Sequence, residues 1–356
     1  MRLVILACCL IPACLIAAVA GKLSRELKAQ TLAQRFDKSG KYAQVSAFIT
    51  DDYALDKNNL PIAEYGFVQA LEKAGVDISE ETGRTYLYGY SKPVGPVFIS
   101  GSKGSAAAEA TAVGGDFFMF HPYELCSGTY FDTEDVNGDG VILDTDTAWT
   151  LFGSSNVAGM QVDIGGRIYP VRGVIRRDTG LFTKASGEDD SMIFISYGVA
   201  DSMLGGGEYG EKTGITCFEI LMKNPVRHFA YDTLKKVLED SYGVQEGSCE
   251  LVENSSRFSL LSELKVVLNM GKRSMKTNSV TYPGWENRAR GYEDVVSVLT
   301  LVKCLLFIYP IVIIVIYAIR LVKILKEKIK KLIASIRKKA DDKYLKKWLE
   351  RQETNV

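Results

Sequence analysis

Histidine is scarce in this sequence: only His121 and His228 occur in 356 residues, and no nucleophile-elbow motif with Ser or Cys accompanies them. A catalytic triad built on histidine is therefore not predicted. Seven cysteines are present, but no C-x-x-C pair occurs, so the sequence offers neither a zinc-ligand pattern nor a disulfide scaffold. These shortages argue against an enzyme, and we expect both histidines to be structural.

The formal net charge is zero, because 43 Lys and Arg balance 43 Asp and Glu. The balance hides an asymmetry. Thirteen Lys and Arg but only four acids lie between Arg320 and Arg351, so the preceding 319 residues carry more acidic than basic side chains. Positive charge beside an apolar run is typical of a membrane protein, so we do not expect a nucleic acid partner.

Two long apolar runs lie near the ends of the chain. Leu3–Gly21 has no charged residue, and Leu299–Ile319 is interrupted only by one Lys and one Pro, so both are long enough to span a bilayer. Ala18-Val19-Ala20 would also fit the cleavage site of a signal peptide. The single basic residue before the first run, Arg2, and the length of that run favour an uncleaved anchor.

The basic tail predicts the orientation of the chain in the membrane, because Lys and Arg close to a membrane span stay on the cytoplasmic side. The C-terminus is then cytoplasmic, and two spans return the N-terminus to the same side. We therefore expect a multi-pass protein of the cell membrane with two spans and an extracytoplasmic domain between them. The lipid bilayer is its first predicted partner.

Apolar spacing between the two runs predicts an α+β domain with two strand-and-helix regions. The predicted segments are strand Tyr42–Thr50, helix Leu60–Val76, two or three strands within Thr85–Phe120 with a hairpin turn at Gly101–Gly104, strand Ile215–Met222, helix Val226–Leu238 starting at Asn224-Pro225, and strand Cys249–Val252. Residues 122–213 show short strand patterns separated by Gly-rich turns, which is typical of an insertion with its own small core.

A series of motifs runs in order through this region. They are Gly114-Gly-Asp-Phe-Phe118, Gly128-Thr-Tyr-Phe131, Ala148-Trp-Thr-Leu-Phe-Gly153 and Gly159-Met-Gln-Val-Asp-Ile-Gly-Gly-Arg-Ile-Tyr-Pro-Val-Arg-Gly-Val174. In this order they resemble the MacB-type periplasmic core domain of ABC-transporter permeases, in the MacB/FtsX-like permease family. The stretches Val252–Arg257 and Tyr282–Arg288 look like a subgroup of Gram-positive permease-like proteins.

The resemblance implies a porter-like αβ lobe interrupted by a β-rich lobe, placed after the first membrane helix. The predicted parts are membrane helix 1–22, porter-like lobe 23–121, inserted β-rich lobe 122–213, second part of the porter-like lobe and stalk 214–297, membrane helix 298–319, and basic amphipathic helix 320–356. The family usually has three helices after the core domain, whereas one follows here. We find no nucleotide-binding domain in this sequence, so we expect any ATPase to be a separate chain.

Two functions remain as hypotheses. The first is a permease-like subunit or accessory protein of an ABC transporter system, working as an oligomer with a separate ATPase, with another permease subunit, or with both. The second is a membrane-anchored extracytoplasmic binding or sensing module that depends on calcium.

One acidic loop has the spacing of an EF-hand calcium site. Its candidate ligands are Asp135, Asn137, Asp139, the Val141 carbonyl and Asp146, with Gly140 at the sharp turn. Position twelve normally holds a glutamate, and Asp146 is shorter. The alternative is an acidic turn in which Asp144 caps the helix that contains Trp149. Calcium is the one cofactor that the sequence suggests.

The basic tail also has an apolar face. Leu321, Leu325, Ile329, Leu332, Ile333 and Ile336 fall on one side of a helix that carries lysines on the other. Such a helix can lie on the anionic inner leaflet or dock a cytoplasmic partner such as an ATPase. The sequence alone leaves both readings open.

Overall fold

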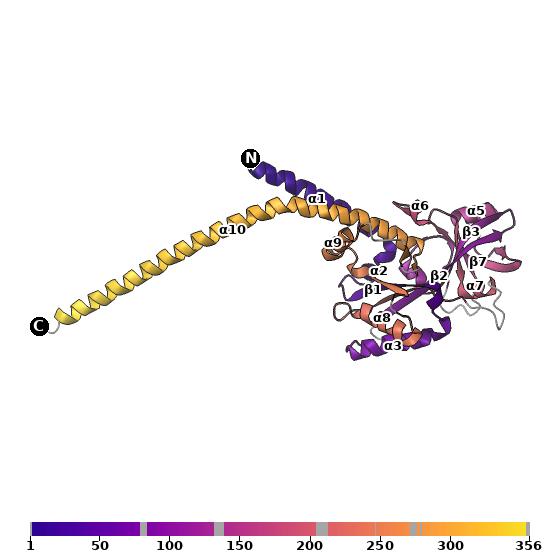
Figure 1. Cartoon of the computed structure of the whole chain (residues 1–356), viewed down its shortest axis with the longest axis horizontal. Coiled ribbons are helices and arrows are strands. Elements are labelled where there is room, and N and C mark those ends of the chain that lie inside the picture. The colour runs from indigo at the N-terminus through magenta and orange to yellow at the C-terminus, as the bar shows by residue number, and fades with distance from the viewer. Residues whose placement is uncertain are drawn as a thin grey trace. The chain divides into compact units, whose positions relative to one another are not determined.

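The computed structural model describes residues 2–78, 84–131, 139–203, 213–245, 247–270, 276–277 and 280–353 (Figure 1). The chain divides into two compact units. One consists of Met1–Val19 together with Leu299–Val356, and the other is Ala20–Val298. The first unit holds the apolar runs and the basic tail, and the second contains the β-sheet.

Within the described part of the second unit, ten strands form one mixed sheet. Its order is β10-β1-β9-β2-β3-β8-β5-β7-β4, and β6 pairs with β2 and β7 beside this path. The pairs β3–β8 and β5–β7 are parallel, and the others are antiparallel. The strands are β1 (Tyr42–Ile49), β2 (Tyr86–Ser100), β3 (Ser105–Gly115), β4 (Glu124–Gly128), β5 (Val141–Asp144), β6 (Gln161–Ile164), β7 (Arg167–Arg176), β8 (Met192–Ser196), β9 (Cys217–Lys223) and β10 (Cys249–Glu253).

Strands β2 and β3 form the predicted hairpin. The turn lies at Gly101–Gly104, where the Gly101 amide donates to the Gly104 carbonyl at 2.8 Å. The pairing register shifts between Pro93 and Gly95, because proline lacks an amide hydrogen and Gly95 adopts a φ of +99°. The start of β2 pairs with β9 and its end pairs with β6, so this hairpin joins the first strands to the inserted ones.

The insertion at 122–213 supplies β4 to β8 and continues the same sheet, because β8 pairs with β3. Several of its described apolar residues, such as Val141 and Val174, belong to one buried cluster with Val45 and Phe67 of the first region. They therefore share a core with the rest of the domain. The division into lobes at residues 122 and 213 stays a prediction.

Helices α3 (Leu60–Lys73) and α8 (Phe229–Tyr242) pack against each other beside the sheet, as Figure 1 shows. Helix α3 buries Leu60, Ala63, Phe67 and Leu71, which follow the helical spacing expected from the sequence. The predicted start of α8 at Asn224 is wrong by several residues. His228 takes a φ of +64°, which breaks the helix before Phe229, and the Asn224 side chain accepts a hydrogen bond from the Ala230 amide at 3.1 Å.

Shorter helices complete the domain. They are α2 (Leu32–Phe36), α4 (Phe117–Phe120), α5 (Thr145–Phe152), α6 (Thr183–Ser186), α7 (Tyr197–Met203) and α9 (Leu260–Leu268), with the short 3-10 helices η1 (Lys28–Gln30), η2 (Asp51–Tyr53), η3 (Lys57–Asn59) and η5 (Asn254–Ser256). A two-residue pair, β11 (Lys276–Thr277) with β12 (Val280–Thr281), precedes the last helix. The α+β fold class predicted from the sequence is confirmed.

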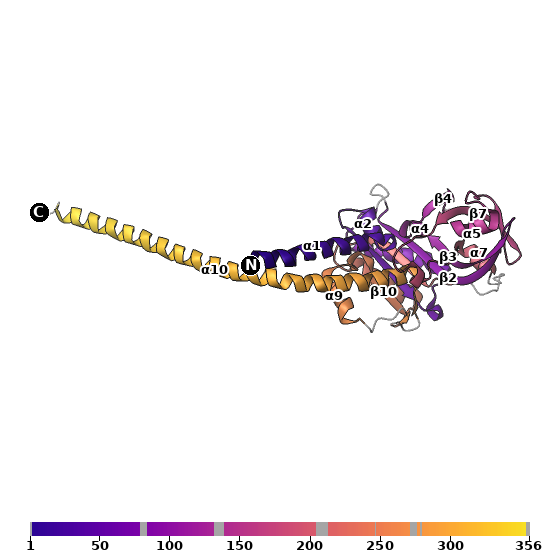
Figure 2. The ribbon, with the colours of Figure 1, turned by 90° about the horizontal axis from the view of Figure 1, so that it is seen from above.

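The two long helices are α1 (Arg2–Glu26) and α10 (Gly284–Glu353). Among the described residues, Ile5–Glu26 and Gly284–Lys343 are long and apolar enough to cross a membrane. Apolar side chains of this unit, such as Leu305 and Ile314, are more than half exposed, and a lipid phase would cover them. Figure 2 shows α10 as one continuous helix, which joins the predicted stalk, the second span and the basic tail.

Candidate functional site: the joint at the start of helix α10

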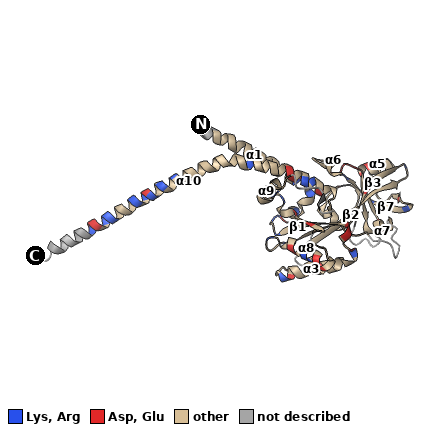
Figure 3. Cartoon of the chain, in the orientation of Figure 1, with Lys and Arg blue, Asp and Glu red and all other residues tan. Residues whose placement is uncertain are grey.

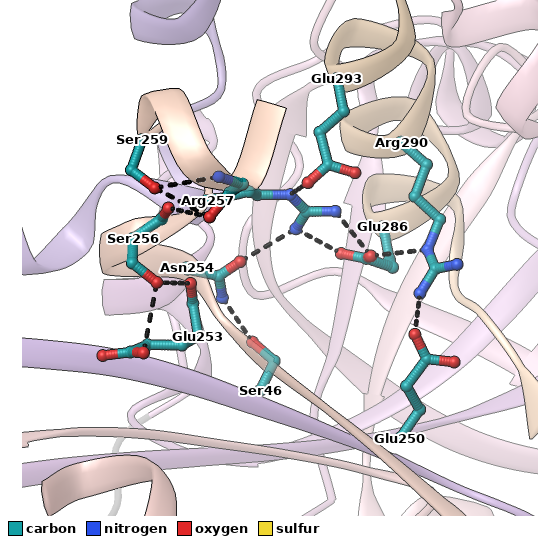
Figure 4. A network of polar contacts seen from close by, with 11 residues as sticks. Ser46, Glu250, Glu253, Asn254, Ser256, Arg257, Ser259, Glu286, Arg290 and Glu293 are labelled. Atoms are coloured by element: carbon teal, nitrogen blue, oxygen red, sulfur yellow. Dashed lines mark hydrogen bonds and ion pairs between the residues drawn. The ribbon is translucent and has the colours of Figure 1, made fainter. Parts of the chain in front are cut away.

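A buried arginine fixes the first turns of α10 to the domain (Figure 4). Arg257, which follows β10 and η5, donates from both terminal nitrogens to the two carboxylate oxygens of Glu286 at 2.7 and 2.8 Å. Its Nε donates to Glu293 at 2.7 Å. Glu286 and Glu293 lie seven residues apart and so share one face of the helix. We call Glu250, Arg257, Glu286, Arg290 and Glu293 the α10 joint.

The second arginine of the joint extends it to strand β10. Arg290 donates to Glu286 at 2.9 Å and to Glu250 at 2.7 Å. Its guanidinium also lies 3.8 Å from the centre of the Tyr282 ring, a cation–π distance. The Tyr282 hydroxyl donates to Glu250 as well. Each carboxylate named here therefore has at least one charged partner.

Burial and charge act in opposite directions on these arginines. Burial alone would lower the pKa of Arg257, but the carboxylates of Glu286 and Glu293 outweigh it, and the pKa lies above the usual value. The pKa of Arg290 is raised in the same way by Glu286 and Glu250 against the effect of burial. Both guanidinium groups therefore stay charged inside the domain, held by the carboxylates of α10 and β10.

Polar contacts continue from the joint into the sheet. Asn254 accepts from Arg257 at 2.9 Å and donates to the Ser46 hydroxyl of β1 at 2.8 Å. Ser46 donates to Glu219 of β9 at 2.7 Å, and the other oxygen of Glu219 lies 2.5 Å from Nε2 of His121. These side chains are nearly inaccessible to solvent. A chain of buried contacts thus runs from α10 through two central strands to the residue after α4.

A separate arginine ties α10 to the inserted residues. Arg288 lies 3.1 Å from Asp178, in the segment after β7, and 3.1 Å from Glu188, in the segment after α6. Burial raises the pKa of Glu188, although Arg288 counteracts this effect. The charged form of Glu188 therefore depends on the nearby guanidinium, and α10 carries that guanidinium.

Close packing completes the contact. Gly291 lies against Phe182, and a Cβ atom at this position would stand 2.9 Å from the ring, so a larger residue would push the two segments apart. Tyr292 donates to Glu26 at the end of α1 at 3.0 Å, and it shares a small apolar cluster with Leu27. The start of α10 therefore contacts the end of α1, strand β10 and the insertion, all within the unit Ala20–Val298.

This arrangement anchors the start of α10 in the domain. The helix that carries the second apolar run begins inside the domain and is held there by buried ion pairs on two sides. The stretches Val252–Arg257 and Tyr282–Arg288, quoted above for their resemblance, are the segments that the structure brings together. Sequence patterns did not predict the ion-pair partners of Glu293 or Asp178. A signal was present in the charges at helical spacing, Glu286, Arg290 and Glu293, just before an apolar run.

The predicted calcium loop is only partly described, because Asp135 and Asn137 lie outside the described residues. Asp139 accepts from Arg172 at 3.3 Å, and Asp146 pairs with Arg177. Val141 begins β5. Asp144 caps α5 by accepting from the Thr147 amide at 2.8 Å, as the alternative reading expected. Across the described ranges, no group of three or more His, Cys, Asp or Glu side chains could hold a metal.

Calcium binding therefore stays a prediction. Calorimetric titration of the full-length protein with calcium should show binding heat that Asp139→Ala removes, because this change deletes an oxygen ligand. Glu124→Ala, which alters an exposed carboxylate outside the loop, is the control. Absence of heat at millimolar calcium would contradict the prediction.

Comparison with known proteins agrees with this architecture. The described residues comprise one domain with a mixed β-sheet and two helices that are long and apolar enough to cross a membrane. Residues 91–226 match the family model of the MacB-like periplasmic core domain, which confirms the resemblance seen in the sequence. The chain therefore carries a MacB-like periplasmic core domain and is a membrane protein with an extracytoplasmic domain. His121, Asp178, Glu188 and Glu219 lie inside the matched range, whereas the α10 joint lies after it.

Two solved structures are similar to the chain. The extracellular domain of the noncanonic ABC-type transporter YknZ from Gram-positive bacteria has 13% sequence identity and a TM-score of 0.39, with 59% of this chain and 99% of that chain covered. The periplasmic region of MacB from Actinobacillus actinomycetemcomitans has 13% identity and a TM-score of 0.42, with 65% and 94% covered. No curated protein matches the chain.

Proposed function

We propose that this protein is a permease-like membrane subunit of an ABC transporter system, and that α10 couples its extracytoplasmic domain to a separate ATPase. The observation that carries the proposal is the continuity of one helix. Helix α10 is held in the domain by the contact of Glu286 with Arg257 and by the contact of its own Arg288 with Asp178. The same helix also contains the second apolar run and the basic tail. A displacement of its cytoplasmic end would be passed along the backbone to the joint.

The α10 joint should make α10 and the domain move together, because sliding of α10 within the domain would break buried ion pairs. Breaking a buried ion pair by separating its partners costs about 3–5 kcal/mol, since the charges left behind have no solvent to replace the lost contact. Arg257 and Arg288 would both have to separate from their partners before α10 could slide within the domain. Small rotations of α10 should instead move strand β10 on one side and the segment that carries Asp178 on the other.

The basic tail supports a cytoplasmic C-terminus, because nine Lys and Arg against one acid lie between residues 320 and 339, next to the second run. With two spans, the N-terminus is cytoplasmic too. The proposed partners are the lipid bilayer, the separate ATPase, another permease subunit and further copies of the chain. The chain has no proposed nucleic acid partner.

Purification from native membranes in a mild detergent tests this function. We expect an ATP-binding protein to co-purify, with an ATPase rate that changes when Arg288→Gln loosens α10 from the insertion. Arg176→Gln, which alters an exposed ion pair with Glu124, is the matched control and should leave the rate unchanged. If neither an ATP-binding protein nor another permease subunit co-purified, the sensing-module hypothesis would replace the transporter hypothesis.

A further inference from the structure

Helix α9 carries leucines on its exposed side and an acid on its buried side. The leucines fall within a sector of about 100° on the helix and are Leu260, Leu261, Leu264 and Leu268. Leu261 and Leu268 are 64% and 80% exposed, whereas Glu263 is 7% exposed. A surface helix normally turns its apolar face toward the core. The leucine face of α9, defined by these four residues, therefore needs an apolar covering surface.

The start of α9 lies close to the point where the first apolar run ends. Phe258, two residues before α9, and Leu23 of α1 pack against the same buried cluster. This cluster consists of Leu27, Ala289 and Tyr292. Along the chain, Leu23 and Leu27 lie about 3 and 9 Å beyond Gly21, the last residue of the run. The headgroup layer is roughly 5–8 Å thick, so α9 begins at the membrane surface.

The α10 joint holds α9 in this place. Arg257, three residues before α9, is buried in its ion pairs with Glu286 and Glu293 of α10. The Ser259 side chain then caps α9 by accepting from the Ser262 amide at 3.3 Å. Because only two residues separate Arg257 from α9, the helix cannot move away from the end of α1 without breaking these pairs.

A bilayer fits the leucine face better than a second copy of the chain does. A stable protein interface buries roughly 800 Å² per partner, which four leucines on a short helix do not supply. The bilayer needs no such area, because the two spans already hold the chain in it. Only Glu263 and Lys265 are charged within α9, so Figure 3 shows this helix mostly in tan. Lys265 borders the leucines, where its ammonium can reach the phosphates of lipid headgroups.

We propose that α9 is an interfacial helix, whose leucine face lies in the headgroup layer of the outer leaflet. Leu261 and Leu268 insert toward the acyl chains, and Lys265 contacts headgroup phosphates. The domain then rests on the membrane beside the two spans, at the point where Arg257 joins it to α10. This inference requires the membrane location of the chain and no ATPase.

Photo-crosslinking in cell membranes tests this contact on the full-length chain. A photoreactive amino acid replaces Leu268, and in the control it replaces Phe98 of strand β2, which is 66% exposed. We expect lipid adducts, detected by mass spectrometry, from position 268 and none from position 98. Leu260→Glu with Leu261→Glu should remove the adducts from position 268, because charged side chains lose the apolar contact. Leu260→Met with Leu261→Met keeps an apolar face and should retain the adducts.

Several outcomes would overturn the inference. They are adducts from position 268 to a second copy of the chain or to another membrane protein in place of lipid, equal lipid adducts from both positions, and no adducts from either. The transporter function is tested separately by co-purification. Lipid adducts without a co-purifying ATPase would support the interfacial helix and remove that function. A co-purifying ATPase without lipid adducts would do the opposite.

Discussion

Replacing Arg257 with alanine is expected to destabilise the extracytoplasmic domain by about 3–5 kcal/mol. The reason is that Glu286 and Glu293, which are 1% and 8% exposed, would lose three charge-assisted hydrogen bonds from Arg257 while remaining buried, and Glu286 would keep only Arg290 of its two arginine partners. Urea unfolding of the full-length protein in detergent, followed by tryptophan fluorescence, measures the change. Trp285 lies buried next to Glu286 and reports on this region directly.

Two further variants show whether the effect comes from the buried charges. Arg176→Ala breaks an exposed pair with Glu124 and should cost at most about 1 kcal/mol. Arg257→Met combined with Glu286→Gln and Glu293→Gln removes the charges together, so it should be more stable than Arg257→Ala alone. A loss below about 1 kcal/mol for Arg257→Ala would show that the joint does not hold α10.

Local patterns predicted the elements of this fold well. Strand Tyr42–Thr50 is confirmed as β1, and the predicted hairpin turn at Gly101–Gly104 is confirmed between β2 and β3. These features depend on alternation and on turn residues that lie close together in the chain. The helix predicted over Leu60–Val76 is α3 for the same reason.

Long-range features could not be derived in this way. The pairing of β8 with β3 joins residues about 80 positions apart, and no local spacing encodes it. The contact of Arg257 with Glu286 is also invisible to periodicity, because it depends on which charges become buried together. The helical start of α10 at Gly284 is not predicted by apolar periodicity, because its first turns are mostly polar.

The family resemblance identified the type of domain, which apolar periodicity and turn residues did not. The ordered motifs between Gly114 and Val174 identified the core domain, and the family match over residues 91–226 confirms them. Neither the resemblance nor the patterns located the joint, which lies after the matched range. The calcium loop remains a prediction because Asp135 and Asn137 fall outside the described residues.

The seven cysteines make the topology measurable. All are free, and Cys126 on β4 is exposed, whereas Cys217 is buried. Burial raises the pKa of Cys217 well above its usual value and the pKa of Cys249 to about 12, so neither forms the reactive thiolate readily at neutral pH. Cys126 is therefore the natural reporter for the domain, and Lys338→Cys places a second reporter in the tail.

Labelling with a membrane-impermeant maleimide tests the central claim, which is that the MacB-like domain lies outside the cytoplasm while the basic end of α10 lies within it. In intact cells we expect strong labelling that depends on Cys126 and is lost in Cys126→Ser. The cysteine of Lys338→Cys, introduced into the Cys126→Ser background, should react only after the membrane is permeabilised. Labelling of position 338 in intact cells together with protection of Cys126 would contradict the account.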